Sequence, residues 1–203
     1  MRTNASKLQV SLISRVLLGG LHAFATLPLA WLLFDLFNAR LGADPVRELT
    51  HRTGWWALVF LLCSLCMTPL QRISGQGAFI RFRRPLGLWC FAFASLHLAT
   101  FVALDLAFRW SEIADELTQR PFVSIGFIAW LLLVPLALSS NKIMMRKLGR
   151  NWQRLHKMVY VIGALACLHF YWGAKSDVRE PLLFSGVFAV LMLLRLVQFT
   201  YKR

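Results

Sequence analysis

Apolar stretches of about 20 residues, the length that crosses the hydrocarbon layer of a bilayer, alternate with short polar connections along the chain. They cover residues 12–36, 55–71, 87–107, 121–140, 154–172 and 181–199. The pattern predicts an all-α integral membrane protein, a bundle of six transmembrane helices. We expect a single domain over residues 1–203, because no connection is long enough to form a domain outside the membrane.

The composition agrees with a membrane setting. Apolar residues make up 58% of the 203 residues and charged residues 16%, and the mean hydropathy is +0.57. A soluble chain of this length has too little interior to bury so much apolar surface. Abundant Leu, Phe and Trp exclude a disordered chain, and four Cys are too few for a disulfide scaffold.

The charged residues predict the topology. The chain has 23 Lys and Arg against 9 Asp and Glu, a net charge of +14. The basic residues gather in the N-terminal flank, in connections 72–84 and 142–157, and in a C-terminal flank that begins at Arg195. Since basic loops stay in the cytoplasm, we expect both termini there. Anionic lipid, and not nucleic acid, is the expected partner of this charge.

Other local patterns indicate packing and topology only. Ala23-Phe24-Ala25 imitates a signal-peptide cleavage site, but the apolar run continues to Phe37, which favours an uncleaved first span. Cys63 and Cys66 form a C-x-x-C without a second pair, so we interpret them as packing residues. The sequence shows no internal repeat.

The histidines carry the candidate chemistry. His51 is expected at the outer interface, whereas His22, His97, His156 and His169 lie within or at the edge of apolar stretches. An ionisable group in a membrane span is usually kept for function, and the alternative is a hydrogen bond between helices.

The surroundings of these histidines favour a metal centre. A proton or cation path would pair them with acids, but the nearest, Asp35 and Asp105, lie at the outer ends of spans. Neutral imidazoles in an apolar bundle suit haem, which takes axial histidines from facing helices.

Depth along the spans suggests how the histidines pair. His169 lies 13 residues beyond His156, which is about 20 Å along a helix and could place one porphyrin toward each leaflet. We predict His97 and His169 as the pair for an outer haem, and His156, with His22 as its partner, for an inner one. About 140° separates His156 from His169 around an ideal helix, which requires a bulge near Gly163 or haems on different sides of the helix.

Three stretches resemble the MsrQ family, also called YedZ: Leu41–Val46 (LGADPV), Arg83–Leu98 (RRPLGLW through LHL) and Lys147–His156 (KLGRNWQRLH). The resemblance covers nearly the whole chain. That family is the haem-binding membrane subunit of the bacterial periplasmic methionine sulfoxide reductase system. It is a ferric-reductase-like transmembrane protein, related to the membrane part of NADPH oxidases.

The resemblance implies one or two b-type haems, with His97, His156 and His169 at the proposed ligand positions. It also implies an inner-membrane location and electron delivery to a periplasmic molybdopterin methionine sulfoxide reductase that repairs oxidised proteins. FMN is attributed to the family too, although no stretch here reads as a flavin motif.

The redox neighbours of the chain are expected to be separate proteins or lipids. Related reductases continue into a flavin and nicotinamide domain, whereas this chain ends at Arg203 without a Rossmann fingerprint. We therefore expect a cytosolic flavin reductase or membrane quinol as electron donor. The basic connections could dock such a donor, although their role in topology already explains them. The acidic loop Ser111–Gln119 and loop 38–54 could receive the periplasmic partner.

A haem iron with two imidazole ligands has no open position, so we expect electron transfer without substrate chemistry of its own. Two alternatives stay open. One is a b-type cytochrome that oxidises quinol for another partner. The other is a transporter whose histidines line a proton or metal path, which predicts paired acids or broken helices at the membrane midplane.

Overall fold

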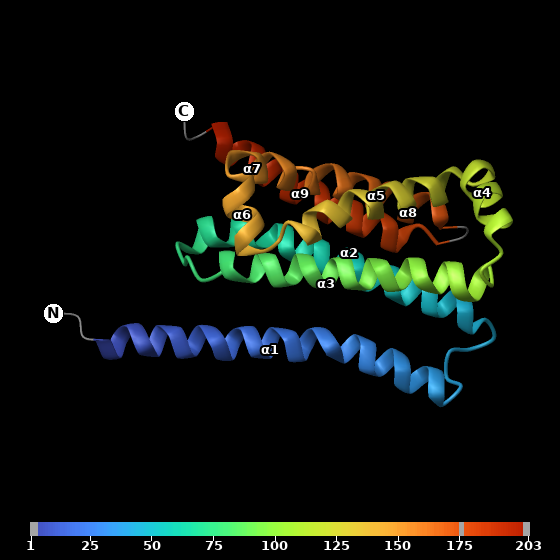
Figure 1. The fold of residues 1–203 in the computed structure, drawn as a ribbon, viewed down its shortest axis with the longest axis horizontal. Helices are drawn as coiled ribbons and strands as arrows, with labels where there is room; N and C mark the ends of the chain where they lie inside the picture. The colour runs from blue at the N-terminus through green and yellow to red at the C-terminus, as the bar shows by residue number, and fades with distance from the viewer. Residues whose placement is uncertain (1–3, 175–176, 201–203) are drawn as a thin grey trace.

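The computed structural model describes residues 4–174 and 177–200, and nearly all of them are helical. The all-α prediction is confirmed. Figure 1 shows the long helices lying side by side, with α1 along one edge. The elements are α1 (Asn4–Phe37), α2 (Pro45–Ser74), α3 (Ile80–Thr100) with a π-helical turn η1 (Phe101–Asp105), α4 (Trp110–Gln119), α5 (Pro121–Leu138), α6 (Lys142–Leu148), α7 (Arg150–His156), α8 (Val159–Gly173) and α9 (Arg179–Thr200).

Five helices among the described residues are long and apolar enough to cross a membrane: they lie in α1, α2, α3 with η1, α5 and α9. The remaining expected span, 154–172, corresponds to α8. Its 15 residues extend about 22 Å, which is less than the roughly 30 Å of hydrocarbon. Even so, α8 runs from the end of the bundle with α7 to the end with α4 (Figure 1). The count of six spans therefore stays a prediction, which the course of α8 supports.

The start of α2 corrects the sequence analysis. The expected span began at residue 55, but the helix begins at Pro45. Asp44 caps it by accepting a hydrogen bond from the backbone N–H of Arg47 at 3.0 Å, and Pro45 occupies the first turn, where no N–H is needed. Hydropathy alone did not detect this polar first part of the helix.

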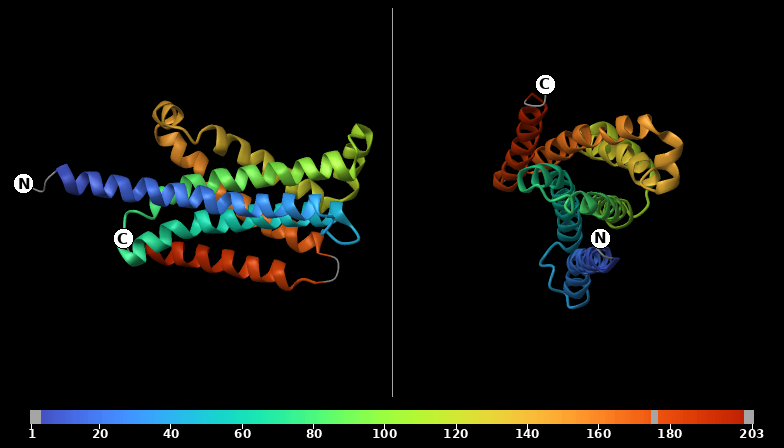
Figure 2. Two further views of the ribbon diagram at one scale, coloured as in Figure 1. Left: turned by 90° about the horizontal axis from the view of Figure 1, so that it is seen from below. Right: turned by 90° about the vertical axis from the view of Figure 1, so that its left-hand side faces the viewer.

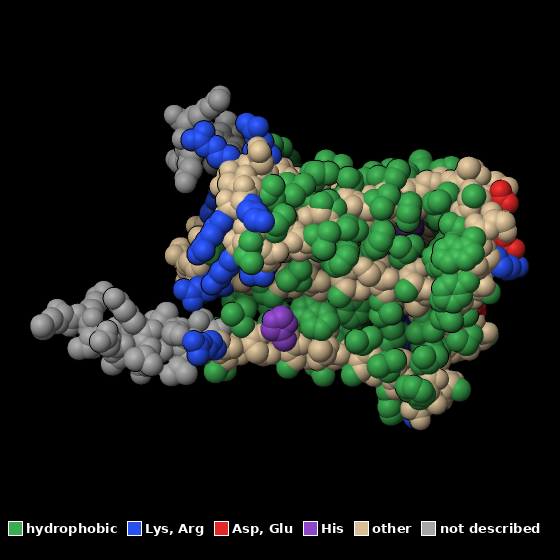
Figure 3. All heavy atoms as spheres, viewed as in Figure 1, with side chains coloured by type: hydrophobic (Ala, Val, Ile, Leu, Met, Phe, Trp, Pro, Cys, Tyr) green, Lys and Arg blue, Asp and Glu red, His purple; other side chains and the backbone are tan. Residues whose placement is uncertain are grey.

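Charge separates the two ends of the bundle. The start of α1 and the end of α9 lie at the same end (Figures 1 and 2). Lys and Arg side chains gather there, and Asp and Glu side chains appear at the opposite end (Figure 3). We call these the basic end (residues 72–84 and 142–157) and the acidic end (residues 38–48, 105–120 and 177–180). The arrangement supports the prediction that both termini are cytoplasmic.

The core forms around α2, which packs against α1, α3, α8 and α9. Leu65 of α2 and Ile162 of α8 are fully buried in this core. The most extensive pairings are α2 with α3 and α5 with α8. By contrast, α1 lies at the periphery, beside α2 and α3 (Figure 2).

Arg195 was predicted to belong to the basic C-terminal flank, but it lies within α9. Its side chain is buried in the bundle. It donates hydrogen bonds to the carbonyl of Leu65 on α2 at 2.6 Å and to the hydroxyl of Tyr160 on α8. A guanidinium inside an apolar bundle must be satisfied by such acceptors, so Arg195 ties α9 to two other helices.

Candidate cofactor site

The structure brings together two of the histidines singled out from the sequence. His97 near the end of α3 and His169 near the end of α8 face each other, with ring centroids 5.9 Å apart and ring planes at 78°. Both helices run toward the acidic end (Figure 1), so the pair lies in that half of the bundle. A metal bound by two imidazoles, with each bond about 2.0–2.1 Å long, separates the two nitrogens by about 4 Å. Because the centroid of an imidazole lies about 1 Å behind its ligating nitrogen, two rings on opposite sides of one metal have centroids about 6 Å apart. The observed 5.9 Å between the centroids suits such an arrangement.

Backbone carbonyls orient both rings. Nδ1 of His97 lies 2.7 Å from the carbonyl oxygen of Thr50 on α2, and Nδ1 of His169 lies 2.7 Å from that of Phe122 on α5. A carbonyl only accepts, so each Nδ1 donates its proton and each neutral ring keeps its lone pair on Nε2. A metal-bound histidine usually has this arrangement, in which the second ring nitrogen donates to a carbonyl or carboxylate.

A glycine lies beside each ring. A Cβ placed on Gly54 of α2 would be 2.9 Å from Nδ1 of His97, and a Cβ on Gly126 of α5 would be 2.7 Å from Nδ1 of His169. Any larger residue would therefore push the imidazole away from its carbonyl. Neither glycine was predicted as a site residue from the sequence. The signal that could have found them is spacing, because each precedes its histidine by 43 residues.

The two histidines line a cavity of about 1220 Å³, which is larger than the roughly 300–1,000 Å³ of a typical small-molecule site. Leu61, Leu133 and Ile162 are among its apolar lining side chains, and charged residues of the acidic end, such as Asp105 and Glu180, also line it. The described residues contain no cluster of three or more His, Cys, Asp or Glu that could hold a metal ion.

This donor set fits haem. A bare metal ion would find only two imidazoles here, whereas a porphyrin brings its own equatorial nitrogens and needs only axial ligands from the protein. The long apolar cavity suits a flat macrocycle.

Helix α4 covers part of the cavity, and it replaces the acidic loop expected at Ser111–Gln119. Trp110, Ile113, Ala114 and Leu117 follow the spacing of one helix face and line the cavity. The acidic residues partly serve the helix itself. Glu112 pairs with Arg109 at 2.8 Å and Glu116 pairs with Arg120 at 3.1 Å, whereas no ion pair of Asp115 is found in the described part of the chain.

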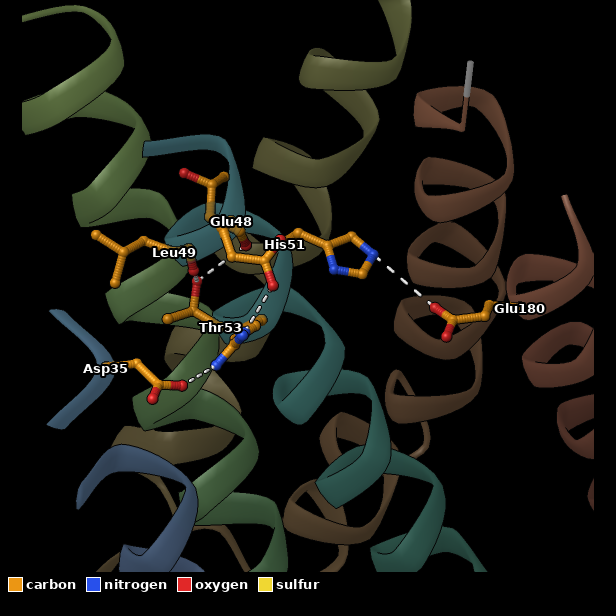
Figure 4. A network of polar contacts seen from close by, with 8 residues as sticks. Asp35, Glu48, Leu49, His51, Thr53 and Glu180 are labelled. Atoms are coloured by element: carbon orange, nitrogen blue, oxygen red, sulfur yellow. Dashed lines mark hydrogen bonds and ion pairs between the residues drawn. The ribbon is translucent and has the colours of Figure 1, made fainter. Parts of the chain in front are cut away.

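A network of charged residues connects neighbouring helices (Figure 4), and two of its members, His51 and Glu180, line the cavity. His51, which was expected at the outer interface, lies in α2 with Nε2 3.9 Å from a carboxylate oxygen of Glu180 on α9. Its neighbour Arg52 donates to Asp35 of α1 at 2.6 Å and to Glu48 at 2.7 Å. These contacts join three helices at the acidic end.

The structure does not bring His156 and His22 together. His156 ends α7, where its ring stacks on Trp152 with centroids 4.0 Å apart and its Nε2 lies 3.4 Å from the hydroxyl of Ser140. His22 is exposed on α1, and its Nδ1 accepts a hydrogen bond from Trp89 on α3 at 3.0 Å. His156 and His22 therefore lie on different helices, and each makes polar contacts with other residues.

The expected bulge near Gly163 is absent from α8. The break lies earlier, between α7 and α8, where the N–H of Met158 donates to the carbonyl of Leu155 at 3.0 Å in a tight turn. This turn separates the helix of His156 from that of His169. Gly163 instead lies against the ring of Phe188 on α9, which supports the packing interpretation of the small residues in this segment.

Comparison with known proteins agrees with this architecture. A family model described as "Ferric reductase like transmembrane component" matches residues 53–167. A curated relative from Xanthomonas euvesicatoria pv. vesicatoria (strain 85-10) is 51% identical over 177 residues, which cover 84% of this chain and 81% of the relative. Relatives from Xanthomonas oryzae pv. oryzae (strain MAFF 311018) and Xanthomonas campestris pv. campestris (strain 8004) are each 50% identical over the same shares. All three are named "Protein-methionine-sulfoxide reductase heme-binding subunit MsrQ".

Proposed function

The chain belongs to the MsrQ family of ferric-reductase-like transmembrane proteins, and from this premise we propose that it binds a b-type haem between His97 and His169. In this proposal the protein is the electron-transfer subunit of a methionine sulfoxide reductase system in the inner membrane. The single observation that carries it is the facing pair of imidazoles, each bound through Nδ1 to a carbonyl, in one large apolar cavity.

The residues around the two histidines orient the imidazoles for haem binding. Thr50 and Phe122 hold each imidazole in the tautomer that leaves Nε2 free to ligate. The glycines beside the rings leave the imidazoles room to take this position, and the apolar side chains of the lining would limit the access of water to a bound haem and so influence its potential.

Bound haem would supply a one-electron ferric–ferrous couple. His97 and His169 would hold the haem, which would leave the iron no open position for a substrate, so the chain would carry electrons and leave substrate chemistry to a partner.

The charge at the two ends gives the expected direction of transfer. Basic loops face the cytoplasm, so the basic end would receive electrons from a cytosolic flavin reductase, or the bundle would take them from membrane quinol. The acidic end, closer to the histidine pair, would face the periplasm. There α4 and the loop before α2 would meet a molybdopterin methionine sulfoxide reductase that repairs oxidised proteins.

Only one haem is proposed on structural grounds. His156 and His22 each contact other groups, and the case for a second, inner haem rests on the position of His156 along its span and on the family resemblance. The case for FMN rests on the family resemblance alone. A b-type cytochrome that oxidises quinol for another partner would share this site and differ only in its redox neighbours.

The test is the reduced-minus-oxidised absorption spectrum of the purified protein. We expect a b-type spectrum, and we expect His97→Ala and His169→Ala each to remove the signal of the haem at this pair. His51→Ala is the matched control, because His51 lines the same cavity but its ring pairs with Glu180. A colourless wild-type protein, or unchanged spectra in both alanine variants, would refute the proposal and revive the transporter alternative.

A further inference from the structure

Each histidine of the pair lies in a helical hairpin, and the two hairpins align without gaps at a constant offset of 72 residues. The first hairpin is α2 with α3, and the second is α5 with α8. His169 follows His97 by 72 residues, and Gly126 follows Gly54 by the same number. In both hairpins, the residue whose carbonyl accepts from the ring lies 47 residues before the histidine.

The correspondence extends over the walls of the cavity. From Thr50 onward, every described residue of α2, α3 and η1 that lines the cavity has a counterpart 72 residues later that lines it as well. Several of these pairs are identical in residue type: Gly54 and Gly126, Ala57 and Ala129, Leu61 and Leu133, Ala94 and Ala166, His97 and His169.

The likeness holds on the cavity side and fades elsewhere. Away from the cavity, Arg52 corresponds to Ser124 and Cys63 to Pro135. No internal repeat was expected from the sequence, and that expectation is wrong for these hairpins. The identical positions are few and most of them line the cavity, although Ala92 and Ala164, and Leu96 and Leu168, match away from it. Unrelated residues separate the matches, so the repeat is hard to see along the chain.

We infer that the two hairpins are equivalent half-sites of one pseudo-symmetric haem clamp, in which Gly54 and Gly126 are positioning residues for the axial ligands. This inference rests on the proposed function. Each half-site contributes a carbonyl, a glycine four residues later on the same helix, and a histidine from the partner helix of the hairpin. Because the glycine has no side chain, the imidazole can reach the carbonyl of the preceding turn and direct Nε2 into the cavity.

An added side chain would meet the imidazole at the same place in both half-sites. An alanine at either glycine places a methyl carbon within 3 Å of the ring, much closer than the roughly 3.5–4.0 Å of favourable contact between heavy atoms. The ring must then move away from its carbonyl, and the hydrogen bond that fixes its tautomer lengthens or breaks. Loss of such a bond behind a metal-bound histidine typically lowers metal affinity about 10–100-fold.

The experiment compares Gly54→Ala, Gly126→Ala and Gly186→Ala in the full-length protein. Gly186 on α9 is the control, since an added Cβ meets nothing within 4 Å there. Each purified apoprotein is titrated with hemin, and the low-spin electron paramagnetic resonance signal and midpoint potential of the loaded protein are recorded. We expect about 10–100-fold weaker hemin binding and a shifted low-spin signal in the first two variants, by similar amounts, and wild-type behaviour in the third.

Each result has a defined meaning. Wild-type protein that fails to bind hemin refutes the proposed function itself. Wild-type protein that binds hemin while both cavity variants match Gly186→Ala overturns the positioning role of the glycines, and an effect at only one of them overturns the equivalence of the halves. If the variants do not fold, nitrogen-15 spectra of histidine-labelled wild-type apoprotein decide: His97 and His169 must both carry the proton on Nδ1, and any other tautomer overturns the inference.

Discussion

The contact between Asp35 and Arg52 allows a sharp test of how the acidic end is held together. Asp35 of α1 has a side chain only 9% exposed, and among the described residues its one ion pair is the 2.6 Å contact with Arg52 of α2. Arg52 is 33% exposed and has a second partner in Glu48. Replacing the arginine leaves a buried carboxylate without its ion-pair partner. Replacing the aspartate leaves a guanidinium that is partly hydrated and still paired with Glu48.

The expected magnitudes follow from this asymmetry. Removing one partner of a fully buried pair costs about 3–5 kcal/mol. Since water reaches Arg52, we expect about 2–3 kcal/mol for Arg52→Ala. Asp35→Asn keeps an oxygen that accepts from Arg52, so its cost should be about 1 kcal/mol. For a chain of this length these values correspond to falls in Tm of about 5–10 °C and about 2–4 °C.

Thermal unfolding in detergent, followed by tryptophan fluorescence, measures these shifts. The matched control is Glu48→Gln, which removes an exposed pair within one helix and should cost about 0.3–0.5 kcal/mol. In the double variant with Asp35→Asn, the effect of Arg52→Ala should largely disappear because no buried charge remains. An Asp35→Asn shift as large as that of Arg52→Ala would refute the reasoning.

Three other substitutions test separate parts of the structure. Asp115→Lys on α4 should slow electron transfer to the proposed periplasmic partner by about two- to fivefold without changing the haem spectrum, and unchanged stopped-flow rates would remove this residue from the proposed docking surface. Arg195→Ala should lower Tm more than Tyr160→Phe does, because the alanine also frees a buried carbonyl; equal shifts in the same fluorescence assay would contradict this. Gly163→Ala should cost about 1–3 kcal/mol by overpacking against Phe188, and a higher Tm would show that the ring moves freely.

The apolar pattern predicted most of the helices, since bilayer thickness fixes how long an apolar run must be. It did not predict their ends. The first part of α2 is polar and depends on the cap at Asp44, and α4 looked like a loop because its apolar face is only a few residues wide. Arg195 was misplaced for a related reason: an arginine near the end of a span can turn inward when acceptors such as Tyr160 lie on neighbouring helices.

The candidate site was partly accessible from the sequence. The scarcity of intramembrane acids and the depth of the spans already favoured His97 with His169. The carbonyl partners could not be predicted, because a backbone group has no signature in the sequence. The glycines carry such a signature, but it becomes visible only when the two hairpins are aligned by their histidines.

The division of the two proposed ligands between two hairpins has a consequence for how the protein is made. His97 belongs to the first hairpin and His169 to the second, so the site with two imidazole ligands would be complete only after the second hairpin has been synthesised and inserted. A low-spin haem signal in cells would then report that both hairpins have assembled inside the bilayer.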